Sequence, residues 1–280
     1  MMNQYNQFRS KLISDTTSII EIEHHYFDKL FNELVANASK IKQDFDETMS
    51  IKDFWYRYAP RQRGHKPRGT SLPWGEVGEK VLDAYMYKTI LTIFPEARFI
   101  GLPYGHDVRF VSNNVFVHLD IKSTGPTDNV DEVVSSPNQV TGDGRLYDEN
   151  GIQNSKVLVV GTSRNMEFQP ELPPFYIIDN QPFITLTFYL KCVYKVIEAG
   201  NQPLDYLELI SVPNGLLMFD TLNYAQNIKG LLTPGKDILS SEHKRTRIKL
   251  NPLAEVANWR CQKIIFDDTG NVTLRHRKEV

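Results

Sequence analysis

The chain has 280 residues, of which 41% are hydrophobic and 24% charged, and its formal net charge is −2. This is an ordinary composition for a folded protein, and the chain contains no internal repeat and no low-complexity tract. The lack of a strong positive balance argues against a domain that binds nucleic acid through overall basicity alone.

No run of apolar residues approaches the length needed to cross a bilayer, and residues 1–14 have no apolar signal core. We therefore expect no membrane association and a cytoplasmic location. Cys192 and Cys261 do not have a metal-binding spacing. They are expected to be reduced thiols, as is usual inside cells.

Helical periodicity dominates the N-terminal part of the chain. Apolar residues at helical spacing predict a core helix over residues 16–38, capped by Asp15 or Thr16. Residues 41–49 either form a second helix or an exposed turn. After a loop rich in Pro, Gly and basic residues, a further helix is predicted over residues 73–94.

Residues 114–122 have the two-residue period of a β-strand. The apolar positions of one face are Val115, Val117, Leu119 and Ile121. Asp120 and Lys122 therefore point together to the opposite face. A carboxylate and an ammonium group one pleat apart are unsuited to filling a core, because buried charge is costly unless it is paired.

The residues just before this strand suggest a carboxylate cluster. A turn predicted at residues 112–114 folds a strand over residues 107–110 back beside it, so that Asp107 approaches Asp120. With Lys122, these carboxylates could hold Mg²⁺, which prefers oxygen ligands, beside a phosphate. The pattern is short, and the alternative is a surface ion pair between neighbouring strands.

The rest of the chain alternates strands with turns. A helix or turn is predicted at residues 131–134 and a turn at residues 233–237. Residues 264–266 and 272–274 are predicted to form a terminal hairpin. Further strands are predicted over residues 157–160, 175–178, 183–193, 206–212 and 244–250.

This pattern predicts an α/β protein of mixed α+β type, with a central mixed β-sheet flanked by helices. We expect residues 1–280 to form a single domain. Residues of about 1–50 would be an N-terminal helical extension, and residues of about 260–280 a C-terminal hairpin.

Positive charge is concentrated in two places despite the balanced total. One is the loop at residues 57–68, and the other is the predicted strand at residues 244–250, where Arg245 and Arg247 share a face. Each is either a solvated surface or a contact for the phosphates of a nucleic acid.

Several motifs follow one another between about residues 51 and 250, and their order is more specific than any single motif. They are RGHKPRG at 63–69, LPWGEVGEK at 72–80, IGLP at 100–103, DIKS at 120–123, SPNQV at 136–140, GIQN at 151–154, SVPNGL at 211–216 and PGKD at 234–237. Together with Arg245-X-Arg247, this series resembles the BglI family of type II restriction endonucleases.

The resemblance implies a restriction-endonuclease-like core of the PD-(D/E)XK nuclease type. Its catalytic residues would be Asp107, Asp120 and Lys122. The carbonyl of Ile121 would join the two aspartates as a metal ligand. Glu79 matches a helix glutamate that places a water molecule or a second metal ion.

The resemblance also implies residues that recognise DNA bases. Asp128 matches an acid that accepts a hydrogen bond from a cytosine amino group. Lys236, Arg245 and Arg247 match residues that read bases in the major groove, and Asp237 is a further acceptor. The expected activity is Mg²⁺-dependent hydrolysis of both strands of double-stranded DNA at a GC-containing site.

Cofactors and partners follow from the same resemblance. Mn²⁺ is expected to replace Mg²⁺, and Ca²⁺ to bind without supporting cleavage. The expected assembly is a homodimer on DNA, or one subunit of a mixed enzyme, with a cognate DNA methyltransferase in the same bacterial cell. The rival functions are a repair or recombination nuclease without a defined site, and a catalytically silent DNA-binding subunit.

Overall fold

The structure is a computed structural model that describes residues 2–50, 74–101, 107–149, 151–197, 201–220, 230–235, 244–267 and 269–277. Its centre is a sheet to which the described residues contribute eight strands, in the order β1-β2-β3-β10-β11-β14-β15, with β9 also paired to β10. The strands are β1 (Arg98–Phe99), β2 (Val108–Ser112), β3 (Val115–Thr124), β9 (Phe175–Ile178), β10 (Gln181–Tyr194), β11 (Leu204–Val212), β14 (Cys261–Phe266) and β15 (Val272–His276).

The central sheet is mixed, which confirms the predicted fold class. β3 and β10 run parallel, whereas β2 with β3 and β10 with β11 are antiparallel. Parallel neighbours need a long crossover connection. Here the crossover is the segment at 125–180, which carries much of the layer that covers one face of the sheet.

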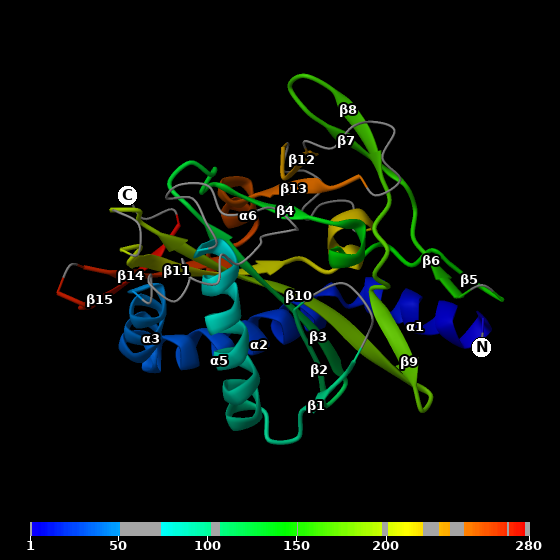
Figure 1. Cartoon of the computed structure of the whole chain (residues 1–280). Coiled ribbons are helices and arrows are strands. Elements are labelled where there is room, and N and C mark those ends of the chain that lie inside the picture. Colours follow the sequence, from blue (N-terminus) through cyan, green and yellow to red (C-terminus); the bar gives the residue numbers. More distant parts are fainter. Residues whose placement is uncertain are drawn as a thin grey trace.

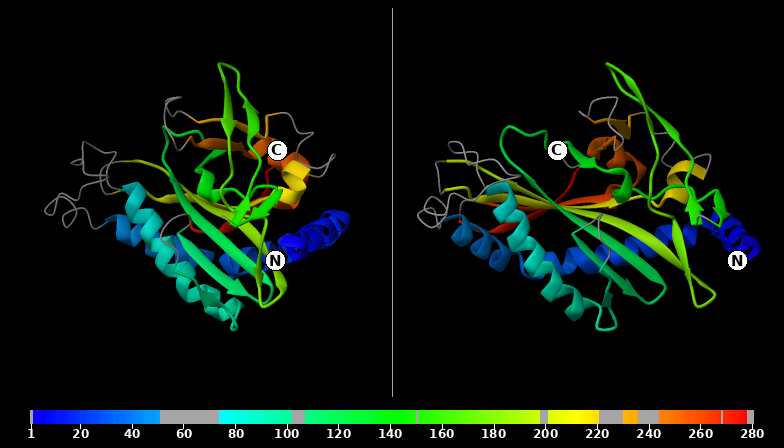
Figure 2. Two further views of the ribbon diagram at one scale, coloured as in Figure 1. Left: turned by 90° about the vertical axis from the view of Figure 1, so that its right-hand side faces the viewer. Right: turned by 45° about the vertical axis from the view of Figure 1, so that its right-hand side comes forward.

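The sheet lies between two layers (Figures 1 and 2). The helices α2, α3 and α5 cover one face, and α6 covers the other together with the strands β4 (Glu132–Ser135), β12 (Leu232–Pro234) and β13 (Thr246–Lys249). The helices are α1 (Met2–Ser14), α2 (Thr16–Ala36), α3 (Ala38–Ser50), α5 (Trp74–Ile93) and α6 (Leu250–Val256), with shorter turns of helix at Pro137–Gln139, Leu216–Asp220 and Asn258–Arg260.

Strand alternation sends neighbouring residues of β10 into two separate cores. Phe188 packs with Phe27 and Leu119 in the core beneath the helices. Tyr189 packs with Ile248 in the core on the other side of the sheet. This two-sided burial explains why nearly every position of β10 is buried.

A small sheet in the order β12-β13-β4 forms part of the second layer. β4 spans Glu132–Ser135, so the helix or turn predicted at residues 131–134 was wrong. The β-branched Val133 and Val134 suit a strand, and they pair with Ile248 and Arg247 of β13. The other strands of this layer are β12 (Leu232–Pro234), β13 (Thr246–Lys249) and the hairpin β7–β8 (Val157–Val160, Asn165–Phe168), whereas the hairpin β5–β6 (Leu146–Asp148, Gly151–Gln153) packs near α1.

The predicted N-terminal helices are confirmed. α2 begins at Thr16 with Asp15 as its cap, because the Ser18 amide donates to Asp15 Oδ1 at 3.3 Å. Residues 41–49 are helical within α3. Among the described residues, no helix combines the length and the apolar character that a membrane span requires.

α1 lies within the helical extension predicted over about residues 1–50, and a long-range contact holds this polar helix against the body of the protein. Tyr5 is fully buried, stacks on Tyr147 and Phe175, and donates a hydrogen bond to the Gly144 carbonyl at 2.9 Å. Gly144 has a φ of +53°, and a Cβ there would lie 2.2 Å from the Tyr5 hydroxyl. A glycine is therefore required where α1 meets the body of the protein.

A buried ion pair joins α2 to the short helix at Asn258–Arg260. Glu23 and Arg260 are 1% and 0% exposed, and Arg260 Nη2 lies 2.5 Å from Glu23 Oε2. The other Glu23 oxygen accepts from the Asn214 amide at 2.6 Å. Burial raises the pKa of Glu23, while Arg260 and these hydrogen bonds oppose the rise.

Candidate active site

The predicted hairpin forms and brings two aspartates together. Asn113 has a φ of 49°, a conformation that suits a tight hairpin turn. β2 then pairs antiparallel with β3, and Val108 lies opposite Leu119. The next step of this register places Asp107 opposite Asp120, and Asp107 Oδ2 accepts a hydrogen bond from the Ile121 amide at 2.8 Å.

Asp120 is the most buried carboxylate of this cluster, at 2% exposed. Lys122 Nζ lies 2.5 Å from its Oδ2, and the Gln139 side-chain amide donates to its Oδ1. Burial raises the pKa of Asp120 to about 7. Lys122 opposes this rise, whereas the negative charges of Asp107 and Glu79 add to it.

Glu79 reaches the same cluster from α5. Its Oε1 accepts hydrogen bonds from the Ser123 amide and the Ser123 hydroxyl, both at 3.1 Å. Burial raises the pKa of Glu79, the hydrogen bonds from Ser123 lower it, and Asp107 raises it further. The helix thus adds a third carboxyl group beside β3.

The cluster opens into a cleft of about 660 Å³. Its lining includes Glu79 and Lys122 together with Arg245 and Arg247. Asp128 also lines the cleft, and its Oδ2 accepts a hydrogen bond from the Gly125 amide at 3.0 Å. The structure therefore brings Glu79, Lys122 and three of the predicted base-reading residues to one cleft, and the ion pair with Lys122 places Asp120 next to it.

Arg247 is held by an acid that the sequence did not single out. Its Nη1 lies 2.5 Å from Oε1 of Glu132, and Lys249 contacts the other oxygen of the same carboxylate. Glu132 is only 8% exposed. These ion pairs fix the side chains of Arg247 and Lys249 on β13 against the neighbouring strand β4.

Two further predictions lie outside the described residues: Lys236 and Asp237, which follow β12, and the basic loop at residues 57–68.

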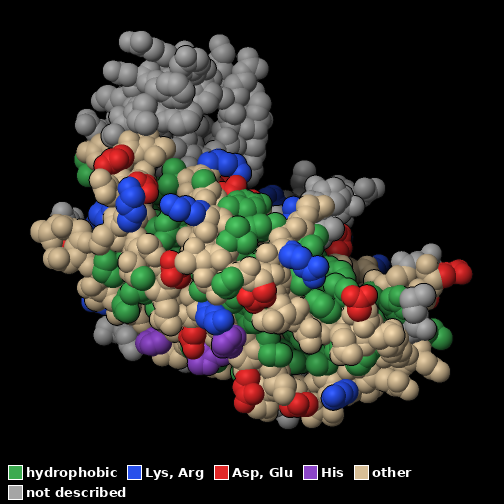
Figure 3. All heavy atoms as spheres, turned by 90° about the horizontal axis from the view of Figure 1, so that it is seen from below, with side chains coloured by type: hydrophobic (Ala, Val, Ile, Leu, Met, Phe, Trp, Pro, Cys, Tyr) green, Lys and Arg blue, Asp and Glu red, His purple; other side chains and the backbone are tan. Residues whose placement is uncertain are grey.

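The helical face of the molecule is seen in Figure 3, where acidic and basic side chains are interspersed among the coloured residues. A face of mixed sign gives little attraction for a polyanion, in contrast to the arginine-lined cleft.

Gln139 was also missed as a member of the site. A signal for its position was present, because Ser136 and Gln139 have the spacing of a capping box, and the structure forms one around Pro137–Gln139. That spacing predicts the local turn, but not the contact of its amide with Asp120.

The residues present fit a divalent cation. Within the described part of the chain, no group of three or more His, Cys, Asp or Glu side chains has the geometry of a complete metal site. Asp107 and Asp120 nevertheless supply two adjacent carboxylates. Two carboxylates with a main-chain carbonyl are a donor set for Mg²⁺, which keeps several waters and rarely takes an all-protein cage.

Comparisons with known proteins define the class. The family described as restriction endonuclease BglI matches residues 1–264. The chain is 32% identical over 281 residues to the type II restriction enzyme BglI of Bacillus subtilis, covering 90% of this chain and 92% of that enzyme. The class is thus that of the type II restriction endonucleases.

The solved structure of restriction endonuclease BglI bound to its DNA recognition sequence matches with a TM-score of 0.83. It is 31% identical, and the match covers 95% of this chain and 96% of that one. The chain belongs to the BglI family of restriction endonucleases. The family match includes α1, α2 and α3, whereas the sequence motifs alone began at about residue 51.

A more distant solved structure shares the fold. It is the tetrameric restriction endonuclease SfiI bound to cognate DNA, with a TM-score of 0.58 and 14% identity over 92% of this chain and 93% of that one. At this identity the likeness concerns the fold alone.

Proposed function

We propose that the chain hydrolyses one phosphodiester bond in each strand of double-stranded DNA at a specific site, using Mg²⁺. The observation that carries this proposal is the convergence of Asp107 and Asp120 with Lys122, which lines the same cleft as Arg245 and Arg247. The family to which the chain belongs consists of site-specific endonucleases, and the proposed chemistry accounts for that activity.

Asp107, Asp120 and the carbonyl of Ile121 would hold the metal ion. A bound divalent cation supplies polarisation of the scissile phosphate and lowers the pKa of a coordinated water. The buried Asp120 has its pKa raised to about 7, so its charged form is short of compensation without a cation.

Lys122 stabilises the charge that develops on the phosphate. Its side chain is 29% exposed and lines the cleft, so its ammonium can reach a phosphate while it remains 2.5 Å from Asp120. Such a donor acts where charge develops during the reaction. Glu79, held by Ser123, orients a water molecule or shares in holding a second metal ion.

Recognition belongs to the other residues of the cleft. Arg245 and Arg247 present planar guanidinium groups, which pair with O6 and N7 of guanine. Asp128 accepts from a cytosine amino group, and a cleft with these groups favours a GC-containing site. Lys236 and Asp237 follow β12 in the sequence and are proposed as further base contacts.

The proposed assembly is a homodimer on DNA. Two identical sites related by a two-fold axis match the two antiparallel strands, so the recognition sequence has matching halves. A mixed enzyme with a second subunit is the alternative. We place the protein in the bacterial cytoplasm as a single domain, alongside a methyltransferase that protects the same sequence.

The direct test is to incubate the purified protein with plasmid DNA, with Mg²⁺ or with EDTA, and to map the ends. Discrete fragments with 5′-phosphates that require the cation support the proposal. A smear favours a repair or recombination nuclease, and intact DNA favours a silent binding subunit. Mn²⁺ should replace Mg²⁺, and Ca²⁺ should support binding alone.

The matched variant for this test is Asp120→Asn. Loss of a ligand charge should abolish cleavage while the protein remains folded. DNA binding should persist, because the repulsion between Asp120 and the phosphate is removed. Cleavage by Asp120→Asn near the parent rate would remove Asp120 from the active site.

A further inference from the structure

The segment at residues 128–132 lies between the strand that carries the proposed catalytic residues and the residues proposed to recognise bases. It follows the catalytic strand β3 and leads into β4. Asp128 stands at its start, and Glu132, the partner of Arg247, stands at its end. The placement of this one segment therefore affects both proposed base contacts.

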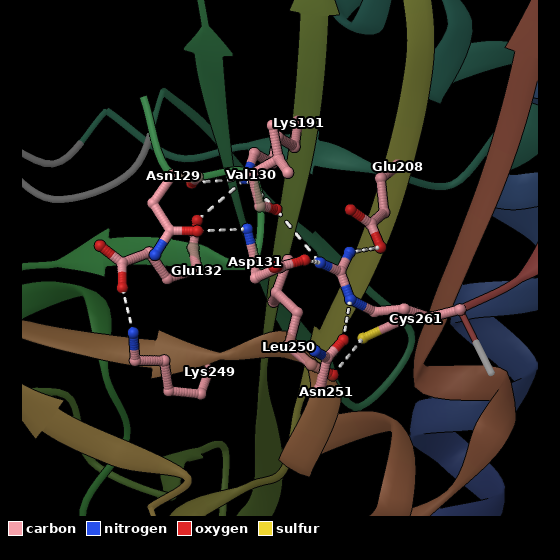
Figure 4. A network of polar contacts seen from close by, with 11 residues as sticks. Asn129, Val130, Asp131, Glu132, Lys191, Glu208, Lys249, Leu250, Asn251 and Cys261 are labelled. Atoms are coloured by element: carbon pink, nitrogen blue, oxygen red, sulfur yellow. Dashed lines mark hydrogen bonds and ion pairs between the residues drawn. The ribbon is translucent and has the colours of Figure 1, made fainter. Parts of the chain in front are cut away.

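A buried lysine holds the backbone of this segment (Figure 4). Lys191 lies on β10 and is 1% exposed. Its Nζ donates to the carbonyls of Val130 at 2.7 Å, Glu132 at 2.9 Å and Asn129 at 3.5 Å. An ammonium group has three donors, and the segment supplies an acceptor for each of them.

Arg277, which directly follows β15, bonds the same segment. Its Nη2 donates to the Val130 carbonyl at 3.2 Å and contacts the Asp131 carboxylate. Its Nη1 lies 2.5 Å from Oε1 of Glu208, which is fully buried on β11 (Figure 4). The segment is therefore fastened to the interior of the central sheet.

The position of Lys191 in the sheet links it to the catalytic strand. β10 runs parallel to β3, and Lys191 is the register partner of Lys122. Residues at matching positions of paired strands point to the same face. The proposed catalytic lysine, Lys122, and the lysine that holds the segment at residues 128–132 are therefore neighbours on adjacent strands.

The segment also contacts β13, the strand that carries Arg247. The Leu250 amide, directly after β13, donates to the Asp131 carbonyl at 3.0 Å. Glu132 pairs in register with Lys249 and bonds Arg247. A shift of the segment would therefore move Asp128 and Arg247 together, because both are fixed through it.

We propose that Lys191 is a positioning residue for sequence recognition, which fixes the segment at residues 128–132 so that Asp128 and Arg247 face their base pairs together. This inference rests on the proposed function. Without the ammonium group, three buried carbonyls lose their donor, and buried polar groups left unpaired force the backbone to rearrange.

The test compares Lys191→Met with a matched control, Lys195→Met. Lys195 follows β10, is 51% exposed and lies 3.0 Å from Asp205, away from the segment. Cleavage by the full-length enzyme with Mg²⁺ is measured as kcat/KM on a duplex that carries the site mapped for the parent. It is also measured on duplexes in which each base pair of that site is replaced in turn.

Lys191→Met should lose discrimination by on the order of 10-fold, at the base pairs where Asp128→Asn or Arg247→Ala also loses it. Lys195→Met should discriminate between the duplexes as the parent does. Arg277→Gln should lose discrimination at the same base pairs as Lys191→Met. The ratio of rates on two duplexes does not depend on the folded fraction, so a destabilised variant remains informative.

A parent-like profile for Lys191→Met, whatever its absolute rate, overturns the inference. So does a loss spread evenly over all base pairs, or an unchanged profile in both Asp128→Asn and Arg247→Ala. A parent enzyme that makes no discrete fragments contradicts the proposed function instead, so the two failures are distinguishable.

Discussion

Gln139 donates a hydrogen bond to Asp120, although it lies beyond β4 in a short helix at Pro137–Gln139. Its own Oε1 accepts from the Ser136 amide at 3.0 Å, which fixes the orientation of the side-chain amide. One oxygen of Asp120 therefore faces Gln139 and the other faces Lys122. The carboxylate is held in place before any metal ion binds.

Gln139→Ala should weaken the proposed metal site without removing a ligand. Groups that orient metal ligands usually contribute about 10–100-fold to metal affinity or activity. We expect the Mg²⁺ concentration for half-maximal cleavage to rise by a factor in this range. Asn138→Ala, in the same short helix, is the control. An unchanged Mg²⁺ dependence in Gln139→Ala would show that Asp120 needs no such support.

Asp120→Asn should make the metal-free protein more stable at neutral pH. The folded-state pKa of Asp120 is about 7, above the ordinary value near 3.8. The folded state therefore binds the proton more tightly than the unfolded state does. The free energy of unfolding gains from this at low pH, and the gain is lost as the pH rises to about 7. The loss is on the order of 4 kcal/mol at most.

The measurement is the free energy of unfolding in EDTA between pH 5 and pH 8. The parent should lose stability as the pH rises, and Asp120→Asn should show a flatter profile and the higher value at pH 8. Equal slopes for the two proteins would mean that Asp120 titrates near its ordinary pKa.

Lys122→Ala should reduce turnover more than DNA binding. Lys122 is partly exposed in the cleft, and its proposed role arises as charge develops on the phosphate. An interaction made only in the transition state lowers kcat and leaves KM largely unchanged. Single-turnover cleavage and binding in Ca²⁺ separate these effects. A rise in KM at constant kcat would place Lys122 in ground-state binding.

Arg247→Ala should separate base reading from phosphate contact. If Arg247 reads a base, its loss should cost roughly 1–3 kcal/mol on the specific site and little on random DNA. A phosphate contact would instead weaken both complexes about equally and reduce the salt slope by about one unit. Binding titrations in Ca²⁺ at several salt concentrations distinguish the two, and equal losses on both duplexes would rule out base reading.

Glu23→Gln should destabilise the whole protein. It leaves the fully buried Arg260 without a compensating charge, and breaking such a pair typically costs about 3–5 kcal/mol. Glu21→Gln changes an exposed residue of the same helix and should have little effect. Urea unfolding of both variants tests this, and matching midpoints would mean that Arg260 is satisfied without Glu23.

The sequence predicted features that depend on short-range patterns. Asp107 and Asp120 meet because a tight turn near Asn113 fixes the register between adjacent strands, and alternation then fixes the faces. The central sheet and its helices follow from similar periodicity. The roles proposed for these side chains still await the experiments above.

Features that depend on distant contacts were not predictable. Nothing local marks Glu132 as the partner of Arg247, because that pairing requires β4 and β13 to be neighbours. Lys191 looks like one more residue of a strand until the crossover places carbonyls around it. In the same way, nothing local marks Tyr5 and Arg9 of the polar helix α1 as the residues that bond the carbonyls of Gly144 and Asp143.

The ion pair between Glu23 and Arg260 spans 237 positions of the sequence. A ribosome adds about 5–20 residues per second, so Glu23 waits roughly 10–50 s after its own synthesis for its partner to be made. β14, the neighbour of β11 in the sheet, also arrives only then. A chain whose synthesis has not yet passed Arg260 and β14 therefore lacks both this ion pair and one strand of the central sheet.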